Sequence, residues 1–160
     1  MVICMTEFIR IGVRVMIHDV VYIVLVKISQ KLEYACRATV QLAKNTDSIL
    51  RLEEIAQREN VSSNFLVQIL NLLRSEGIIK SKRGKYGGYY MDRNPEDISL
   101  YEIVKAVNSG VVADATVKDG ESAESVANTW VKISQNIDQL LKDTSLQDMM
   151  GNENTYMYYI

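Results

Sequence analysis

The sequence predicts a mainly α-helical fold with a small β-hairpin, in which a winged helix-turn-helix precedes a long C-terminal helix suited to dimerisation. Two helical patterns meet at a tight turn around residues 60–61. The stretch IIKSKRGKYGGYYM, residues 78–91, then sets two short β-type runs around a basic, glycine-rich turn. Near the end of the chain, apolar residues recur at heptad spacing. This order of helix, turn, helix and hairpin is that of a winged helix-turn-helix.

Length and composition allow one domain of ordinary size. The chain has 160 residues, 48% of them hydrophobic, and a formal net charge of -2. We therefore expect a core that forms without disulfides, and a surface that is not basic throughout. Any contact with nucleic acid must then come from a local patch. Basic residues outnumber acidic ones over residues 74–93, where the acids are Glu76 and Asp92. The basic residues of this stretch are Arg74, Lys80, Lys82, Arg83, Lys85 and Arg93.

The predicted domain boundaries follow the changes in pattern. Residues 27–93 form the winged helix-turn-helix DNA-binding domain, and residues 94–150 form a linker helix, a loop and the dimerisation helix. Residues 151–160 form a tail. Residues 1–26 form an N-terminal extension that is apolar but interrupted by charges, so it predicts neither a membrane span nor a signal peptide. An extra strand or an extra interface element is one reading of this extension.

Three helical segments precede the hairpin. Residues 28–44 carry apolar side chains at helical spacing and predict the first helix. The second covers residues 50–60, with acids in its first turn, where the helix dipole favours them. Ser62 or Ser63 is expected to cap a third helix, which runs to about Glu76.

The third helix has two different faces. Its apolar face predicts packing against the core, and its other face carries short hydrogen-bonding side chains that include Asn64 and Gln68. Such a polar face, on the second helix after a tight turn, fits the recognition helix of a helix-turn-helix. An ordinary helical hairpin is the alternative interpretation of these residues alone.

The hairpin over residues 78–91 has a tip that combines flexibility with positive charge. Gly84, Gly87 and Gly88 allow backbone conformations that side chains forbid, and they let the main chain approach whatever it touches. Directly after a recognition helix, such a hairpin is the wing, and its cations suit a phosphate backbone or a minor groove. Taken alone, the same turn is also compatible with an ordinary solvated loop.

Beyond the wing, a turn at Asn94-Pro95 leads into a helix that contains Leu100 and Val107. Residues 109–124 have no sustained period and predict a loop. The last clear helix begins at residue 121 or 122 and runs to about residue 142.

An apolar seam at heptad spacing marks this last helix. The residues of the seam are Val126, Trp130, Ile133, Ile137 and Leu140. We favour packing against a second copy, because the remaining core is small. In addition, two helix-turn-helix domains that bind one DNA site together require a two-fold axis. Packing within the chain is the alternative. From residue 145 onwards we expect a disordered or loosely docked tail.

The small number of cysteines limits the metal and redox chemistry that the chain can perform. Cys4 and Cys36 are too few for a disulfide framework, a zinc site or a thiolate-ligated cluster, so no metal or other cofactor is expected and a reducing cytoplasm is the expected compartment. Cys36 reads as a small buried residue, with a redox-sensing thiol as the alternative. No catalytic triad, paired acids or P-loop is present, so we do not expect an enzyme.

These stretches together resemble the Rrf2 family of bacterial winged-helix regulators. The resemblance runs from residue 27 to about residue 150. The matching stretches are KISQKLEYACRATVQLA, LEEIAQRENVSSNFLVQILNLLRSEGII, SKRGKYGGYYM, DISLYEIVKAVN and WVKISQNIDQLLKDTSLQDM. The RGxxGGY pattern of the wing, placed directly after the helices, is the most specific of these features.

The resemblance implies a homodimer with a long crossing helix, which binds a partly palindromic operator and usually represses transcription. It places Ser62, Ser63, Asn64 and Gln68 at base edges. It places Arg83, Lys85, Tyr86, Gly87 and Gly88 at the neighbouring groove. It adds backbone contacts from Lys27, Gln30 and Tyr34.

The chain departs from part of this family in its cysteines. Cluster-binding members carry three cysteines in the loop after the wing helix, and residues 109–127 contain none. Because thiolates hold such clusters, the chain resembles the cluster-free branch, which is controlled by a partner protein or a small molecule. Members normally begin at the residue before KISQ, here Val26. If this protein also begins at Val26, residues 1–25 are translated upstream sequence and not part of the working protein.

Two functions from different classes follow. The leading hypothesis is a sequence-specific DNA-binding transcriptional regulator, a cytoplasmic homodimeric repressor whose partners are double-stranded DNA and a second copy of itself, with no membrane partner. The alternative is a winged-helix protein-interaction module, in which the basic wing holds an acidic partner without specific DNA binding.

Overall fold

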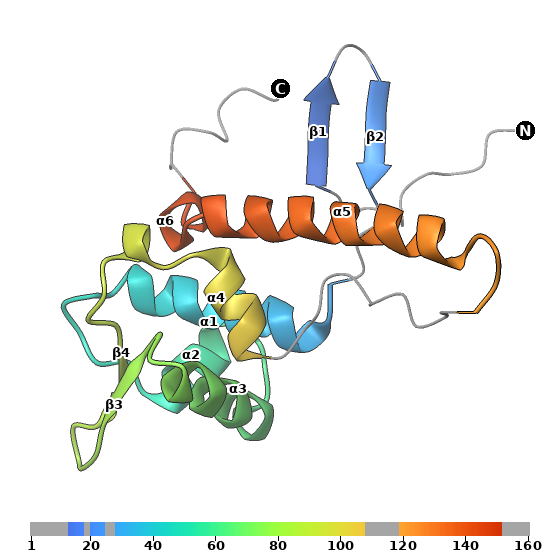
Figure 1. Cartoon of the computed structure of the whole chain (residues 1–160). Helices are drawn as coiled ribbons and strands as arrows, with labels where there is room; N and C mark the ends of the chain where they lie inside the picture. The colour runs from blue at the N-terminus through green and yellow to red at the C-terminus, as the bar shows by residue number, and fades with distance from the viewer. Residues whose placement is uncertain (1–12, 18–19, 25–27, 108–118, 152–160) are drawn as a thin grey trace, which may run out of the picture.

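The computed structural model describes residues 13–17, 20–24, 28–107 and 119–151. A helical domain with a projecting hairpin lies beneath one long helix (Figure 1), which confirms the predicted fold class. The elements, in chain order, are β1 (Val13–Ile17), β2 (Val20–Val24), α1 (Gln30–Ala43), α2 (Leu52–Arg58), α3 (Ser63–Ser75), β3 (Lys80–Lys82), β4 (Gly88–Tyr90), the 3-10 helix η1 (Pro95–Asp97), α4 (Leu100–Ala106), α5 (Ala123–Asp143) and α6 (Leu146–Met149).

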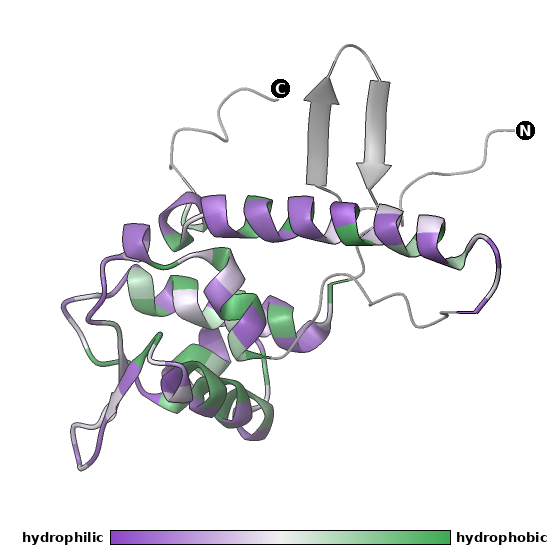
Figure 2. Ribbon diagram, viewed as in Figure 1, coloured by the Kyte–Doolittle hydropathy of each residue, from purple (hydrophilic) through white to green (hydrophobic). Residues whose placement is uncertain are grey.

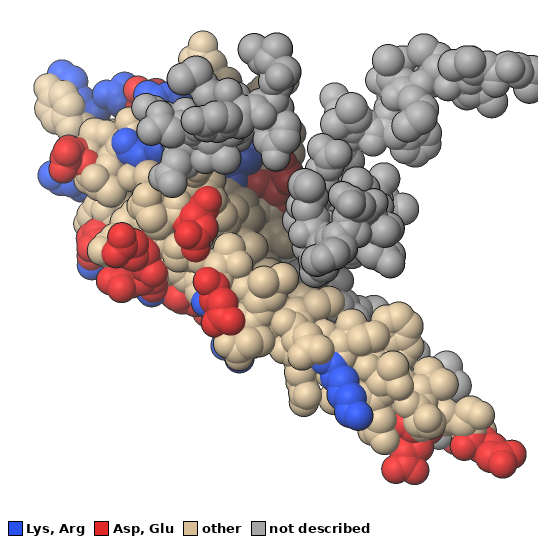
Figure 3. All heavy atoms as spheres, turned by 90° about the horizontal axis from the view of Figure 1, so that it is seen from above, with Lys and Arg blue, Asp and Glu red and all other residues tan. Residues whose placement is uncertain are grey.

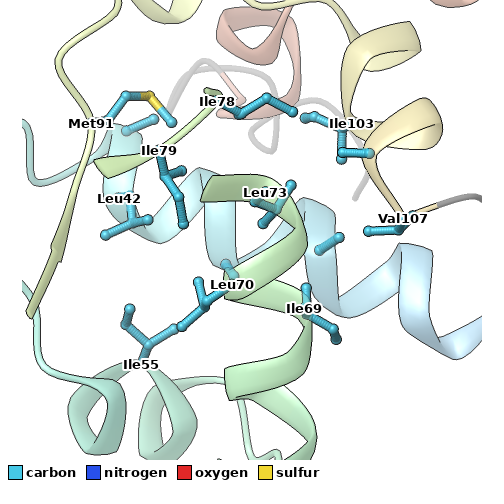
Figure 4. Close-up of a cluster of buried hydrophobic side chains, with 14 of the residues drawn as sticks. Leu42, Ile55, Ile69, Leu70, Leu73, Ile78, Ile79, Met91, Ile103 and Val107 are labelled. Carbon is cyan, nitrogen blue, oxygen red and sulfur yellow. The ribbon is translucent and has the colours of Figure 1, made fainter. Parts of the chain in front are cut away.

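The core of the domain lies between α1, α2, α3 and α4. The apolar residues of α3 that have no exposed surface are Leu66, Ile69, Leu70 and Leu73. Figure 4 shows Leu70 beside Ile55 of α2, with Leu42 of α1 nearby. Burying one such side chain contributes about 1.5–3 kcal/mol. This apolar face fixes the orientation of α3 and directs its polar face toward solvent.

Serine side chains cap the starts of α1, α3, α4 and α6. Each serine oxygen accepts a hydrogen bond from a backbone amide three residues later, and the capping residues are Ser29, Ser62, Ser99 and Ser145. A cap of this kind contributes about 1 kcal/mol. In the turn before Ser62, Asn60 has a φ of 51°, in the left-handed region that asparagine tolerates better than most residues. The predicted tight turn and cap are thereby confirmed, with Ser62 as the capping residue.

The wing is anchored to the helices by its second strand. β3 pairs with β4 antiparallel, with Lys82 opposite Gly88. β4 also pairs with Leu50, just before α2: the Leu50 amide donates to the Tyr89 carbonyl at 2.9 Å, and the Tyr89 amide donates to the Leu50 carbonyl at 2.8 Å. A Cβ at Gly88 would lie 2.3 Å from the Leu50 carbonyl oxygen. Glycine at this position is therefore required by the packing of the chain itself.

α5 lies across the top of the domain, and α6 fastens its C-terminal end (Figure 1). The Leu146 amide donates to the Ile98 carbonyl at 2.7 Å, and the Leu146 side chain has no exposed surface. The expectation of a disordered or loosely docked tail from residue 145 is therefore wrong for residues 145–149. It failed because a four-residue helix has no period of its own and is held by contacts distant in sequence. Residues 152–160 lie outside the described residues.

The N-terminal extension contains a hairpin of its own. β1 and β2 form an antiparallel hairpin, with Val13 opposite Val24, in agreement with the reading of the extension as extra strand. Among the described helices, none combines the length and apolar character needed to cross a membrane.

The buried face of α3 generates a stability prediction. Leu73→Ala is expected to lower the free energy of unfolding by about 2–5 kcal/mol, because it removes buried methyl groups and leaves a cavity. The neighbouring Leu72 is only half-buried, so Leu72→Ala is the matched control and should cost less. Urea unfolding followed by circular dichroism measures both. Equal losses for the two variants would contradict the assignment of faces.

An ion pair between the wing exit and α4 generates a prediction on pH. Arg93 Nη1 lies 2.7 Å from Glu102 Oε2, and this hydrogen bond lowers the pKa of the Glu102 carboxyl. A carboxyl with a lowered folded pKa adds stability above its unfolded pKa, and that stability is lost as pH falls through the folded pKa. Glu102→Gln should therefore destabilise at neutral pH and have little effect in acid. Urea unfolding at several pH values measures the free energy of unfolding of both proteins. A difference between them that stayed constant with pH would contradict this prediction. Glu124→Gln, at an exposed position of α5, is the control.

Candidate nucleic-acid interface

The N-terminal half of α3 presents a polar edge to solvent. Asn64 and Gln68 are exposed, four residues apart and thus on one face of the helix, and Ser63 is half-buried beside them. Ser62 is exposed, and its oxygen accepts from the Phe65 amide at 3.3 Å. A hydroxyl that accepts one bond still has a hydrogen to donate. The edge thus offers amide and hydroxyl groups, the types that read base edges in a major groove.

The wing tip carries cations that no acid neutralises within the described part of the chain. Lys82, Arg83 and Lys85 are exposed and form no ion pair there, whereas Lys80 at the base of the wing pairs with Asp92. Tyr86 is 75% exposed, and the Lys85 Nζ lies 5.7 Å from its ring centroid. An aromatic ring so open to solvent, amid unpaired cations, is typical of surfaces that contact nucleic acid.

The glycines of the wing play a more structural part than their sequence context indicated. Gly84 has a φ of 110°, which side chains rarely adopt. A Cβ at Gly87 would lie 2.3 Å from the Lys82 carbonyl oxygen, and Gly88 is confined by Leu50 as described above. The close approach that glycine permits is therefore between segments of this chain at Gly87 and Gly88.

Two arginines brace the wing from the helices. Arg51 Nη2 donates to the Lys85 carbonyl at 3.1 Å, and Arg74 Nη1 donates to Ser81 Oγ at 3.3 Å. Neither arginine was among the predicted site residues. The sequence indicated Arg74 as one of the basic residues that gather around the wing. Arg51 gave no signal, because its partner is far away in the sequence.

The start of α1 lies close to the start of α3. The rings of Tyr34 and Phe65 meet edge to face with centroids 6.0 Å apart, and the Arg37 Cζ lies 5.5 Å from the centroid of the Tyr34 ring. Tyr34 is half-buried and Gln30 is exposed. The structure thus brings these two predicted backbone-contacting residues onto a helix adjacent to α3. The third, Lys27, lies outside the described residues.

α3, which carries the polar edge, and the wing lie on the same side of the domain, away from α5. In Figure 1 both elements lie toward the bottom of the view while α5 runs along the top, and Figure 2 shows hydrophilic residues along the wing. From the α5 side, acidic side chains gather around η1 and α6 (Figure 3). The exposed acids of this region include Glu96, Asp97, Asp143 and Asp148. Such a separation of charge directs a polyanion toward the wing side.

α5 presents an apolar face that nothing in the described chain covers. None of its residues is buried. Of the predicted seam, Ile137 is half-buried and the other residues are exposed: Val126 by 53%, Trp130 by 48%, Ile133 by 37% and Leu140 by 67%. The alternative of packing within the chain therefore does not account for the seam in a single described chain.

The matching family model describes an iron-dependent transcriptional regulator, and it matches residues 28–152. The residues present do not fit an iron–sulfur cluster held by thiolates. The chain has two cysteines, and burial raises the pKa of the Cys36 thiol to about 12, which keeps it protonated at neutral pH. In the described segments, no three or more His, Cys, Asp and Glu side chains gather as a metal site would need. Cys36 was expected to be buried and is only partly buried, and its raised pKa lowers the fraction of thiolate, the form that reacts in a redox sensor.

The chain is similar over most of its length to HTH-type transcriptional regulators. It is 32% identical over 139 residues to the HTH-type transcriptional regulator CymR of Bacillus subtilis, in a match that covers 84% of this chain and 99% of CymR. It is 34% identical over 137 residues to the HTH-type transcriptional regulator IscR of Cereibacter sphaeroides, with coverage of 79% and 88%.

Solved structures agree with these matches. The structure of CymR, the global cysteine regulator of B. subtilis, has a TM-score of 0.67 at 31% identity and covers 78% of this chain and 95% of its own. IscR of T. potens has a TM-score of 0.62 at 31% identity, with coverage of 83% and 96%. The members matched here are transcriptional regulators rather than enzymes. The chain belongs to the Rrf2 family of winged-helix transcriptional regulators.

Proposed function

We propose that this protein is a homodimeric, sequence-specific DNA-binding repressor that recognises a partly palindromic operator. The observation that carries the proposal is the common orientation of two surfaces of different chemistry. The polar edge of α3 supplies hydrogen-bonding side chains, and the wing supplies Lys82, Arg83 and Lys85 without neutralising acids in the described chain. Base edges and backbone phosphates are the two parts of duplex DNA that these chemistries recognise.

In this proposal α3 enters a major groove and reads base edges with Asn64 and Gln68. Carboxamides bind adenine through its N6 and N7 atoms in that groove, and serine hydroxyls bind either donors or acceptors. Arg83 and Lys85 contact the backbone or the adjoining minor groove, beside Tyr86. Because both parts are anchored to the same core, one docking geometry satisfies them together.

The apolar face of α5 supports a two-fold dimer. Val126, Trp130 and Ile133 are exposed in the single chain, and burying them against the same residues of a second copy removes this apolar surface from water. Two α3 helices related by a two-fold axis read two half-sites about one helical turn apart, or a multiple of it. The symmetry of the operator then follows from the symmetry of the protein.

Control of this repressor is proposed to proceed without an iron–sulfur cluster. The small number of cysteines supports this, as does the burial that raises the pKa of the Cys36 thiol. A partner protein or a small molecule would then carry the signal. The B. subtilis relative is described as a global cysteine regulator, and the family model as an iron-dependent regulator.

Separate roles for α3 and the wing generate a binding prediction. Gln68→Ala should weaken binding to the genuine operator by about 1–3 kcal/mol and leave binding to a scrambled duplex nearly unchanged. Arg83→Ala should weaken binding to both duplexes. It should also reduce the steepness of the plot of log affinity against log salt concentration, here called the salt slope, by about 0.9 for one lost phosphate contact. Fluorescence anisotropy with operators recovered by genome-wide footprinting measures both. Gln147→Ala, on the exposed surface of α6, is the control.

Two outcomes would count against this division. If wild type bound genuine and scrambled duplexes equally, while forming a stable complex with an acidic protein, the protein-interaction module would replace the repressor. If Arg83→Ala bound both duplexes as wild type does, the wing would have no role at the DNA.

The proposed dimer generates a prediction on mass. Trp130→Glu should convert the dimer to a folded monomer, because it places a charge in an apolar interface but leaves the single-chain core intact. Gln135→Glu is the matched control, since it adds the same charge at an exposed position of α5 outside the seam. Light scattering after size exclusion gives the mass of each. A monomeric wild type, or a dimeric Trp130→Glu variant, would refute this interface.

A further inference from the structure

A hollow of about 370 Å³ lies between the wing, the start of α2 and the end of α3. Its lining includes Arg51 and Arg74 from the helices, and Lys82, Arg83 and Lys85 from the wing. Glu53 is the acidic residue among those that line it. The positive charge of the hollow therefore exceeds the negative charge several-fold, although the chain as a whole is weakly acidic.

The chemistry of the lining excludes an ordinary small-molecule pocket. Sites for small organic ligands are enclosed and mostly apolar, with few polar groups. This hollow is open and is lined chiefly by charged side chains and glycine backbone. Side chains of like charge held close together repel one another, and a bound anion relieves that repulsion. An anionic group is the ligand that fits.

The two arginines of the hollow are already held in position. Arg51 uses one guanidinium hydrogen for the Lys85 carbonyl at 3.1 Å, and Arg74 uses one for Ser81 Oγ at 3.3 Å. A guanidinium has five N–H donors, so each arginine retains donors for another acceptor. Because these hydrogen bonds fix the side chains before a ligand arrives, little conformational entropy is lost on binding.

We propose that the hollow binds one backbone phosphate of duplex DNA, and that Arg51 both completes this site and holds the wing tip in place. The inference rests on the proposed function, and it adds a residue and a contact that the sequence did not predict. Arg51 acts in two ways: its charge neutralises the phosphate, and its hydrogen bond to Lys85 positions the wing on which Arg83 sits.

The two roles of Arg51 are separable by substitution. Arg51→Ala removes both the charge and the hydrogen bond. Arg51→Lys keeps the charge but replaces the planar fork by a point charge, which cannot hold the Lys85 carbonyl and a phosphate together in the same way. Lys105→Ala is the control, because Lys105 is an exposed cation of α4 that does not line the hollow. Thermal melts establish that each variant folds.

Two measurements on the full chain read out the two roles. The first is the salt dependence of the affinity for a random-sequence duplex of about 30 base pairs, long enough for two half-sites. The second is hydrogen exchange of the Gly87 amide without DNA. This amide donates to the Gly84 carbonyl at 2.9 Å, in the tip that Arg51 braces. Exchange reports positioning of the wing, and the salt slope reports phosphate neutralisation.

The expected results differ for each variant. Arg51→Ala should lower the salt slope by about 0.9 and speed exchange at Gly87. Arg51→Lys should keep the slope of wild type and still speed exchange. Lys105→Ala should change neither. If wild type fails to bind duplex DNA, the proposed function falls and this inference with it. If wild type binds and Arg51→Ala matches Lys105→Ala in slope and exchange, only this inference falls.

Discussion

Two backbone hydrogen bonds between Leu50 and Tyr89 determine where the wing lies relative to the helices. They extend the two-stranded wing by one bridge to the segment just before α2. Because α2 is held by Ile55 in the same core as α3, the position of α3 and the position of the wing are set together. Glycine is required at position 88 for the pairing of Leu50 with Tyr89, because any side chain there would collide with the Leu50 carbonyl. The surface proposed to meet DNA is therefore a product of backbone pairing as well as of side-chain chemistry.

The distribution of charge matters more for this protein than its total. The net charge of -2 would by itself argue against a polyanionic partner. Acids lie around η1 and α6, however, and the unpaired cations lie on the wing. Lys80 and Arg93, at the base of the wing, are used for ion pairs with Asp92 and Glu102. Cations at the base are thus engaged by acids of the chain, while those at the tip remain available to a ligand.

Much of the fold was predictable from local sequence, because periodicity and caps are local properties. Ser62 lies at the start of a strongly amphipathic segment, and it caps α3 as that pattern implies. The short α6 was missed, because Leu146 is held by Ile98 rather than by helical neighbours. The candidate site divides in the same way. The polar edge of α3 follows from spacing along one helix, whereas Arg51 depends on a contact 34 residues away that no local pattern encodes.

α3 and the wing are proposed to form one surface for duplex DNA. Titrating nitrogen-labelled protein with operator duplex, and following backbone amide resonances, tests it most directly. If α3 and the wing do form one surface, the amide resonances of Asn64 and Gln68 should shift together with those of Gly84 and Tyr86, with the same affinity, while those of exposed residues at the middle of α5 should stay unchanged. Shifts confined to α4 and α5, or shifts in α3 that leave the wing unchanged, would contradict it.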